Sequence, residues 1–180
     1  IIYSYFMALR KILTEPNKTL RQKSLKVENV DEHLQQLMND MVETMYAAPG
    51  IGLAAIQVGV PKRVIVLDIS QKEGIKKPMF FVNPEILNRS EKNSTYEEGC
   101  LSVPGQFAEI ERPDSCHIKY LDYYGQPQEL KAKGMLATCI QHEMDHLEGI
   151  LFIDYLSKLK KSMIIKKLSK QKKNIERIVV

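Results

Sequence analysis

Two histidines and a glutamate lie close together toward the C-terminal end of the chain. His142, Glu143 and His146 follow the order H-E-x-x-H within CIQHEMDHLEGILF, residues 139–152. On an α-helix each residue turns by about 100°, so the two imidazoles lie one turn apart on one face and can bind one ion. Glu143 lies beside that face, where a free carboxylate can act as a base. The alternative is a surface helix with two chance histidines, although the chain has only four.

The motif supplies two metal ligands, whereas a catalytic zinc-type site commonly has three and keeps one position for water. In one class of zinc protease a third histidine follows at the position of Phe152, and phenylalanine cannot bind a metal. In another class a glutamate follows on a later helix, but the only acid after Asp154 is Glu176, in a lysine-rich segment. Glu148 is too close along the helix to fold back onto the ion. The third ligand is therefore expected upstream.

Several upstream residues could complete the site, and at this point they are alternatives: His33, Cys100, Cys116, His117 and Cys139. Cys100 is favoured because it lies in EEGCLSVPG, where Gly99 lets the backbone approach a bound group closely. Pro104 and Gly105 are expected to end this segment sharply. A thiolate beside a divalent cation is held deprotonated, which suits a metal ligand.

The elements that must position these residues follow from the spacing of apolar side chains. Three- and four-residue spacing predicts a helix over 31–46, capped by Asn29 or Asp31, with methionines filling the core. Pro49, Gly50 and Gly52 end this helix. Further elements are predicted as an irregular arm at 13–27, strands at 62–69 and 79–87, a hairpin of 114–125 and 126–134 around Gly125, a helix at 135–147 that carries H-E-x-x-H, and a helix at 157–170. Helices at both ends of a run of strands indicate an α+β fold.

The composition fits one globular unit in a reducing compartment. Of 180 residues, 44% are apolar and 27% charged, without an apolar run long enough to span a membrane. Three cysteines are too few, and odd in number, for a disulfide framework. The net charge of +4 is concentrated in residues 158–173, which contain eight lysines and no acid. Met7 is the expected natural start, and residues 1–6 lack the features of a secretory signal.

Three segments together resemble the peptide deformylases. GIGLAAIQVG at 50–59 is similar to the first motif of that family, EGCLSVP at 98–104 to the second, and QHEMDHLEG at 141–149 to the third, in the same order and at similar spacing. The resemblance extends over about residues 9–168. It implies antiparallel and mixed β-sheets around a central helix that carries H-E-x-x-H, with N-terminal and C-terminal helices. A catalytic domain would cover 7–156, and a basic C-terminal helix and tail of the same domain 157–180.

The resemblance also implies a reaction and a role for each residue. The reaction would be metal-dependent hydrolysis of the N-formyl group from N-formylmethionine of nascent polypeptides, releasing formate. The metal ligands would be Cys100, His142 and His146, Glu143 would be the general acid/base, and Gln57 and the backbone N–H of Leu101 would face the formyl oxygen. Without the resemblance, Gln57 would be interpreted as a polar loop residue and Leu101 as part of the core.

The peptide itself would bind along the same site. An extended substrate would pair with the backbone of Ile51, Gly52 and Gly99, where Gly52 has no side chain to block its approach. The methionine side chain would meet an apolar wall formed by Met135, Thr138 and Cys139, which lie upstream of His142 on the same helical face. The alternative is that these three residues are simply core.

The metal and the partners are expectations of the same kind. Spacing indicates a divalent transition metal and no more; the resemblance implies Fe(II), with zinc, nickel or cobalt as substitutes. The basic helix either packs on the domain as a solvated helix or, as the resemblance to bacterial-type enzymes implies, contacts the ribosome. No DNA or membrane partner is expected. A bacterial cytoplasmic location follows, with an organelle origin left open by the undefined natural start.

Two other classes of function compete with this interpretation. A zinc peptidase would share H-E-x-x-H, but it lacks its usual downstream third ligand and leaves Cys100 unexplained. A basic RNA-binding module with a structural metal would leave Glu143 without a role, because a structural site is closed and needs no base.

Overall fold

A five-stranded antiparallel sheet forms the frame of the protein. The computed structural model describes residues 8–71 and 74–178, so the expectations about Met7 and residues 1–6 lie outside the described residues. The strands are β1 (Gly52–Ala54), β2 (Val64–Leu67), β3 (Met79–Arg89), β6 (Ser115–Leu121) and β7 (Pro127–Lys133), in the order β1-β2-β3-β6-β7. A separate two-stranded sheet consists of β4 (Asn93–Cys100) and β5 (Val103–Pro113).

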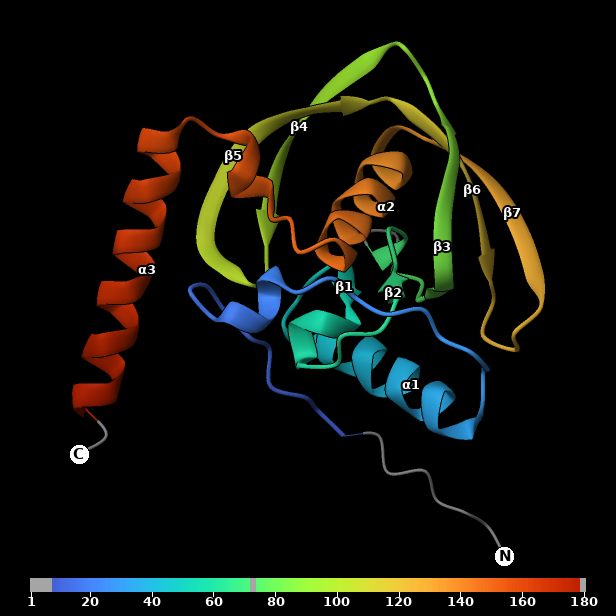
Figure 1. Ribbon diagram of the computed structural model, residues 1–180, viewed down its shortest axis with the longest axis horizontal. Helices are drawn as coiled ribbons and strands as arrows, with labels where there is room; N and C mark the ends of the chain where they lie inside the picture. The colour runs from blue at the N-terminus through green and yellow to red at the C-terminus, as the bar shows by residue number, and fades with distance from the viewer. Residues whose placement is uncertain (1–7, 72–73, 179–180) are drawn as a thin grey trace, which may run out of the picture.

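The helix that carries H-E-x-x-H lies at the centre of the molecule. This helix is α2 (Gly134–Leu147), and Figure 1 shows it between the five-stranded sheet and the β4–β5 pair. The other helices are α1 (Glu32–Ala47) and α3 (Lys158–Ile178), with short 3₁₀ turns at η1 (Lys18–Arg21), η2 (Ala55–Val58) and η4 (Phe152–Tyr155). The predicted α+β fold around a central helix is confirmed. The division of the domain between residues 156 and 157 stays a prediction.

Strand β2 explains how one sheet serves two helices. Its four residues are all fully buried, and successive side chains point to opposite faces. Val64 and Val66 pack in the cluster that contains Met38 and Met41 of α1. Ile65 and Leu67 pack in a second cluster with apolar residues of α2, including Ile140 and Leu147. The sheet is therefore covered on both faces, and α2 is held in the interior.

Most of the predicted elements are confirmed, with small shifts of their ends. Asp31 caps α1, since its side chain accepts a hydrogen bond from the N–H of Leu34 at 2.8 Å. The hairpin β6–β7 turns at Gly125, where φ is 78° and a glycine is favoured. The basic helix extends eight residues further than predicted, to Ile178 rather than residue 170.

The hairpin β4–β5 corrects one expectation. Pro104 and Gly105 do not end the segment, because β5 continues through both of them to Pro113. Proline lacks a donor, but each strand of a two-stranded sheet keeps a free edge where a missing N–H is tolerated. The prediction missed β4 because NSTYEEG is polar and lacks the apolar alternation typical of a strand. The pairing brings Cys100 to a bulge opposite Val103.

The C-terminal helix α3 belongs to the packed body of the protein. Ile164, Ile165 and Leu168 pack in an apolar cluster with residues of β5 and η4, among them Val103, Ile110 and Phe152. Lys161 adds an ion pair with Asp154 at 2.5 Å. Among the described residues, no helix combines the length and apolar character needed to cross a membrane.

Candidate metal centre and active site

Three donor side chains converge where the end of β4 meets α2. His142 and His146 lie one turn apart on α2, with ring centroids 5.1 Å apart and ring planes at 74°. Cys100 ends β4, and its Sγ lies 3.3 Å from Nε2 of His146. One donor atom from each of the three residues lies within 4.8 Å of the other two. Tertiary structure thus joins the H-E-x-x-H helix to the upstream cysteine.

This donor set fits one transition-metal ion. Ligands about 2.0–2.3 Å from a tetrahedral ion lie about 3.3–3.8 Å from one another, the scale of this cluster. One thiolate and two imidazoles suit a transition metal better than calcium or magnesium, which prefer oxygen. Burial and the neighbouring His142 lower the pKa of His146, so its ring is in the neutral form that a ligand needs. Three protein donors leave a fourth position for water, as in catalytic sites.

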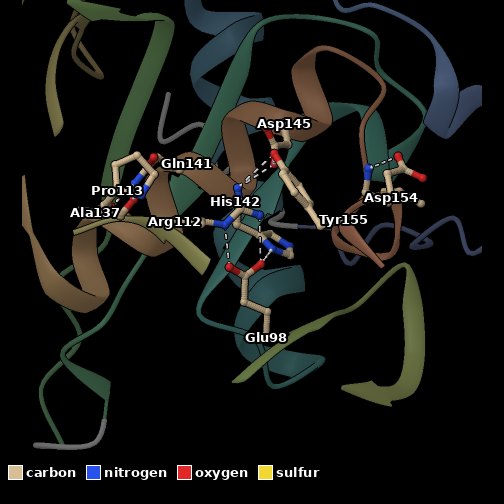
Figure 2. A network of polar contacts seen from close by, with 10 residues as sticks. Glu98, Arg112, Pro113, Ala137, Gln141, His142, Asp145, Asp154 and Tyr155 are labelled. Carbon is tan, nitrogen blue, oxygen red and sulfur yellow. Dashed lines mark hydrogen bonds and ion pairs between the residues drawn. The ribbon is translucent and has the colours of Figure 1, made fainter. Parts of the chain in front are cut away.

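A network of ionic side chains, buried at Glu98 and Arg112, contacts Nδ1 of His142 (Figure 2). Glu98 Oε2 lies 2.8 Å from Nδ1 of His142, and the guanidinium of Arg112 donates to both Glu98 oxygens at 2.6 and 3.0 Å. Arg112 also donates to Asp145 at 2.8 Å, and the Tyr155 hydroxyl donates to the same carboxylate oxygen at 2.8 Å. The sequence analysis missed all four partners, because the network depends on Glu98 and Arg112, which lie far along the chain from α2.

The network determines the ionisation of its members. Burial raises the pKa of Glu98, but hydrogen bonds from His142 and Arg112 outweigh this and hold the pKa below its usual value. Burial likewise lowers the pKa of His142, yet Cys100 and Glu98 raise it well above the ordinary value. Groups that stabilise positive charge on this ring also favour a metal cation beside it. A carboxylate that accepts the Nδ1 proton leaves Nε2 as the ring nitrogen for the metal.

Glu143 has the surroundings of a proton-transfer group. It is 5% exposed, and its Oε2 has no hydrogen-bond partner among the described residues. Burial raises its pKa to about 7, although the nearby charge of His142 acts in the opposite direction. A carboxyl group with this pKa can both accept and return a proton near neutral pH. Gly52 lies against it, since a Cβ on Gly52 would overlap the Glu143 carboxylate.

Gln57 is held in one orientation beside the cluster of three donor side chains. Its Oε1 accepts the N–H of Ala54 at 2.8 Å, and its Nε2 donates to Ser102 Oγ at 3.0 Å. The same Nε2 lies 3.5 Å from Sγ of Cys100. The amide is 1% exposed. The N–H₂ end of Gln57 therefore faces the cluster, which is the orientation of a donor to a reacting oxygen.

A cavity of about 560 Å³ opens beside these groups. All six residues expected to bind the peptide line it, namely Ile51, Gly52, Gly99, Met135, Thr138 and Cys139, and so do Gln57, Cys100, Leu101, His142 and Glu143. Burial raises the pKa of Cys139 to about 12, so this thiol is neutral and contributes to an apolar wall. The roles of these residues stay predictions.

Phe107 is a lining residue that the sequence analysis missed. It comes from β5, is 66% exposed, and lies so close to Gly99 that a Cβ there would overlap its ring. The sequence shows an aromatic residue a few positions after the second motif, but it does not show that Phe107 faces Gly99. Only the β4–β5 register places these two residues opposite one another.

Among the other candidate third ligands, Cys139 lines the cavity but does not belong to the converging donor group, and the remaining three lie elsewhere among the described residues. His117 is on β6 and contacts Glu129 at 2.7 Å. Cys116 is buried in the sheet core, and His33 is on α1. Glu148 forms ion pairs with Arg63 and Lys23.

The chain matches the family model of polypeptide deformylases over residues 9–162. It is 70% identical over 174 residues to a peptide deformylase of Pelagibacter ubique, covering 97% of this chain and all of that protein. A peptide deformylase of Phenylobacterium zucineum is 58% identical over 167 residues, covering 93% of this chain and 99% of the relative.

Solved structures show the same similarity. A peptide deformylase of Ehrlichia chaffeensis bound to actinonin superposes with a TM-score of 0.87 at 45% identity, covering 92% of this chain and 98% of the other. A peptide deformylase of Legionella pneumophila gives a TM-score of 0.87 at 46% identity, covering 94% and 99%. The converging donors, the buried glutamate and the cavity thus occur in a chain that matches one family over most of its length. This chain belongs to the polypeptide deformylase family.

Proposed function

We propose how the residues of this site carry out the reaction of the family, the metal-dependent removal of the N-formyl group from N-formylmethionyl polypeptides with release of formate. The protein is a hydrolase of this kind. The observation that carries the assignment of residues is the convergence of Cys100, His142 and His146 beside Glu143 at one end of a peptide-sized cavity.

The chemistry divides between the metal and the surrounding side chains. A divalent metal held by Cys100, His142 and His146 would act as a Lewis acid and lower the pKa of a water. Glu143 accepts the proton of the attacking water and returns it to the leaving α-amine, while the C–O bond of formate forms and the C–N bond breaks. The raised pKa of Glu143 suits both transfers.

Charge that develops on the formyl oxygen needs fixed donors. Gln57 and Leu101 both line the cavity that Cys100 also lines, and Nε2 of Gln57 lies 3.5 Å from Sγ of Cys100. The donors that they offer are Nε2 of Gln57 and the backbone N–H of Leu101. We assign them to this oxygen, because preorganised donors stabilise the transition state more than the ground state. The bond from Gln57 to Ser102 holds the amide in place before substrate arrives.

The peptide lies along the backbone that borders the cavity. Segment 51–52 and Gly99 offer main-chain groups for an extended substrate, as in strand addition. The methionine side chain enters between Met135, Thr138 and Cys139, which are contributed by α2. Phe107 and Ile51, both exposed, border the path of the residues that follow.

One assay tests this function against its alternatives. The metal-loaded protein is incubated with formyl-Met-Ala-Ser and with Met-Ala-Ser, and both formate and cleaved peptide are measured. Formate from the first peptide alone supports the proposal. Cleavage of either peptide bond would indicate a peptidase. The absence of both formate and cleaved peptide would contradict the proposed hydrolytic activity.

The metal is proposed to be Fe(II), with zinc, nickel or cobalt able to occupy the same donors. A single thiolate with two imidazoles accepts all four ions, and affinity alone does not select iron.

Ribosome contact through α3 is a further part of the proposal. Its outward face carries exposed lysines at 158, 160, 166, 167, 170, 172 and 173. Leu159 and Met163 are 72% and 62% exposed and lie one turn apart among them. The lysines on this face can bind RNA phosphates, and the two apolar side chains can contact protein, so the face suits a surface made of both. This partner implies a location in the cytoplasm of a bacterium.

A further inference from the structure

The loop that follows β2 holds a buried carboxylate that the reaction does not use. Asp68 is 0% exposed. Its oxygens accept hydrogen bonds from the Tyr46 hydroxyl and Ser70 Oγ at 2.6 Å each, and from the N–H groups of Ser70 and Lys77 at 2.8 Å each. A buried carboxylate is stable only when it is bonded in this way. The side chain therefore fixes the loop against the end of α1.

The same loop also donates hydrogen bonds to main-chain carbonyls at the rim of the active-site cavity. The N–H of Asp68 donates to the carbonyl of Ile51 at 2.8 Å. Nε2 of Gln71 donates to the carbonyl of Gly50 at 3.0 Å and to the carbonyl of Asp68 at 3.2 Å. Two successive carbonyls of the rim are thus held from the side of the loop.

The held segment lies between two groups of the chemistry. A Cβ on Gly50 would overlap the side chain of Leu101, and a Cβ on Gly52 would overlap the carboxylate of Glu143. The segment 50–52 therefore packs against Leu101 at one end and Glu143 at the other. Misplacement of a substrate by about 1 Å can cost on the order of a hundredfold in rate. A small shift of segment 50–52 is therefore expected to slow the reaction.

We propose that Asp68 and Gln71 are positioning residues that hold segment 50–52 in register for the peptide backbone of the substrate. This inference rests on the proposed function, in which Ile51 and Gly52 pair with the extended peptide. Neither Asp68 nor Gln71 lines the cavity, so both act through the carbonyls that they hold. One lost hydrogen bond corresponds to a roughly three- to tenfold loss of peptide affinity.

The test compares substrates of different length. In Gln71→Ala, KM for formyl-Met-Ala-Ser rises about three- to tenfold with kcat nearly unchanged. KM for formyl-Met, which lacks the later peptide bonds, changes much less. Asp68→Asn acts in the same direction and more strongly. Gln128→Ala is the matched control, because the side chain of Gln128 is exposed and bonds Asp122 within the β6–β7 hairpin, away from the cavity.

Hydrogen exchange supplies a readout that does not depend on turnover. Amides of residues 50–53 should exchange faster in Gln71→Ala than in the control, while those of α2 should not. Unchanged KM in Gln71→Ala would overturn the proposal. Equal losses for both substrates, with a lower melting temperature, would reduce the two residues to a structural role and overturn it as well. Wild-type protein that releases no formate would instead refute the proposed function.

Discussion

Glu98 places a carboxylate oxygen 2.8 Å from Nδ1 of His142, while Arg112 binds the same carboxylate through two of its nitrogens. The ring of His142, one of the three proposed metal ligands, is thereby held in one orientation by a carboxylate that is not itself one of the donors. Carboxylate–histidine pairs of this kind raise the basicity of the ligand and fix its tautomer. The relationship extends the site beyond its three donors and leads to the first prediction.

Replacing Glu98 should weaken the metal site without removing a ligand. In Glu98→Gln we expect the metal affinity to fall by about 10–100-fold, because Nδ1 of His142 loses its charged acceptor. Titration with a competing chelator measures the affinity. Glu111→Gln is the control, since Glu111 is an exposed acid on the neighbouring strand β5. Equal affinity in Glu98→Gln and the control would show that the pair does not support the metal.

Removing the base should separate metal binding from turnover. Glu143→Ala is expected to keep a full metal complement and to lose about 10²–10⁴-fold in kcat, because Glu98, the other buried carboxylate that lines the cavity, is already bonded to Arg112 and His142. Metal analysis and formate release are measured on the same sample. Cys100→Ala should lose both metal and turnover. If Glu143→Ala kept wild-type kcat, the assignment of Glu143 would be wrong.

A single methyl group at Gly52 should disturb the base. Gly52→Ala places a Cβ on the Glu143 carboxylate, so one of the two must move. We expect kcat to fall on the order of a hundredfold, with the metal retained, because the proton acceptor is displaced. Gly74→Ala is unsuitable as a control because the φ of Gly74 is positive. Ala108→Gly on β5 is the control instead, because it removes one methyl group where Gly52→Ala adds one. Normal kcat in Gly52→Ala would mean that the segment yields without consequence.

The identity of the metal can be tested through oxygen. A ferrous ion with a thiolate ligand is expected to lose activity in air and to keep it under anaerobic conditions. The zinc-substituted protein, which has no redox chemistry, should be insensitive to air. Activity is followed over time in both atmospheres after purification without oxygen. Equal lifetimes in air and without oxygen would contradict the iron assignment.

Ribosome binding is best tested by neutralising lysines and not by deleting the helix. Deletion of 157–180 would remove Leu168, which is 4% exposed and packs in the core, so it would disturb the domain itself. Replacing Lys160, Lys166, Lys167 and Lys170 by Gln should weaken binding and reduce the slope of log affinity against log salt by about 0.7–0.9 per lost phosphate contact.

The control for this variant moves the same charge change to the body of the protein. Four exposed lysines serve this purpose: Lys26, Lys62, Lys131 and Lys133. Sedimentation with ribosomes at several salt concentrations measures binding, and turnover of formyl-Met-Ala-Ser should be unchanged in both variants. Binding that is independent of salt, or equally weakened in both variants, would contradict a docking role for α3.

The amino-acid sequence determined those features that depend on near neighbours. The spacing of His142 and His146 requires one helical face, and the periodicity of residues 31–46 requires an amphipathic helix. The place of Glu143 follows from the same spacing, because a residue next to His142 on a helix lies beside the face that carries the two imidazoles. The sequence did not predict the polar strand β4 or the continuation of β5 through Pro104. Each of these strands is stabilised by pairing with the other, and β4 has no alternation of apolar residues that would reveal it.

Tertiary structure decided which distant residues complete the site. Cys100 reaches His146 across 46 positions, and Glu98 reaches His142 across 44, because β4 folds against a helix that both sheets enclose. The same holds for Asp68 and Gln71, which reach the carbonyls of Ile51 and Gly50 from the loop after β2. The amino-acid sequence determined which side chains could be donors and their order along the chain. Only the packing of buried strands around α2 determined their distances, since contacts between distant segments depend on the whole fold.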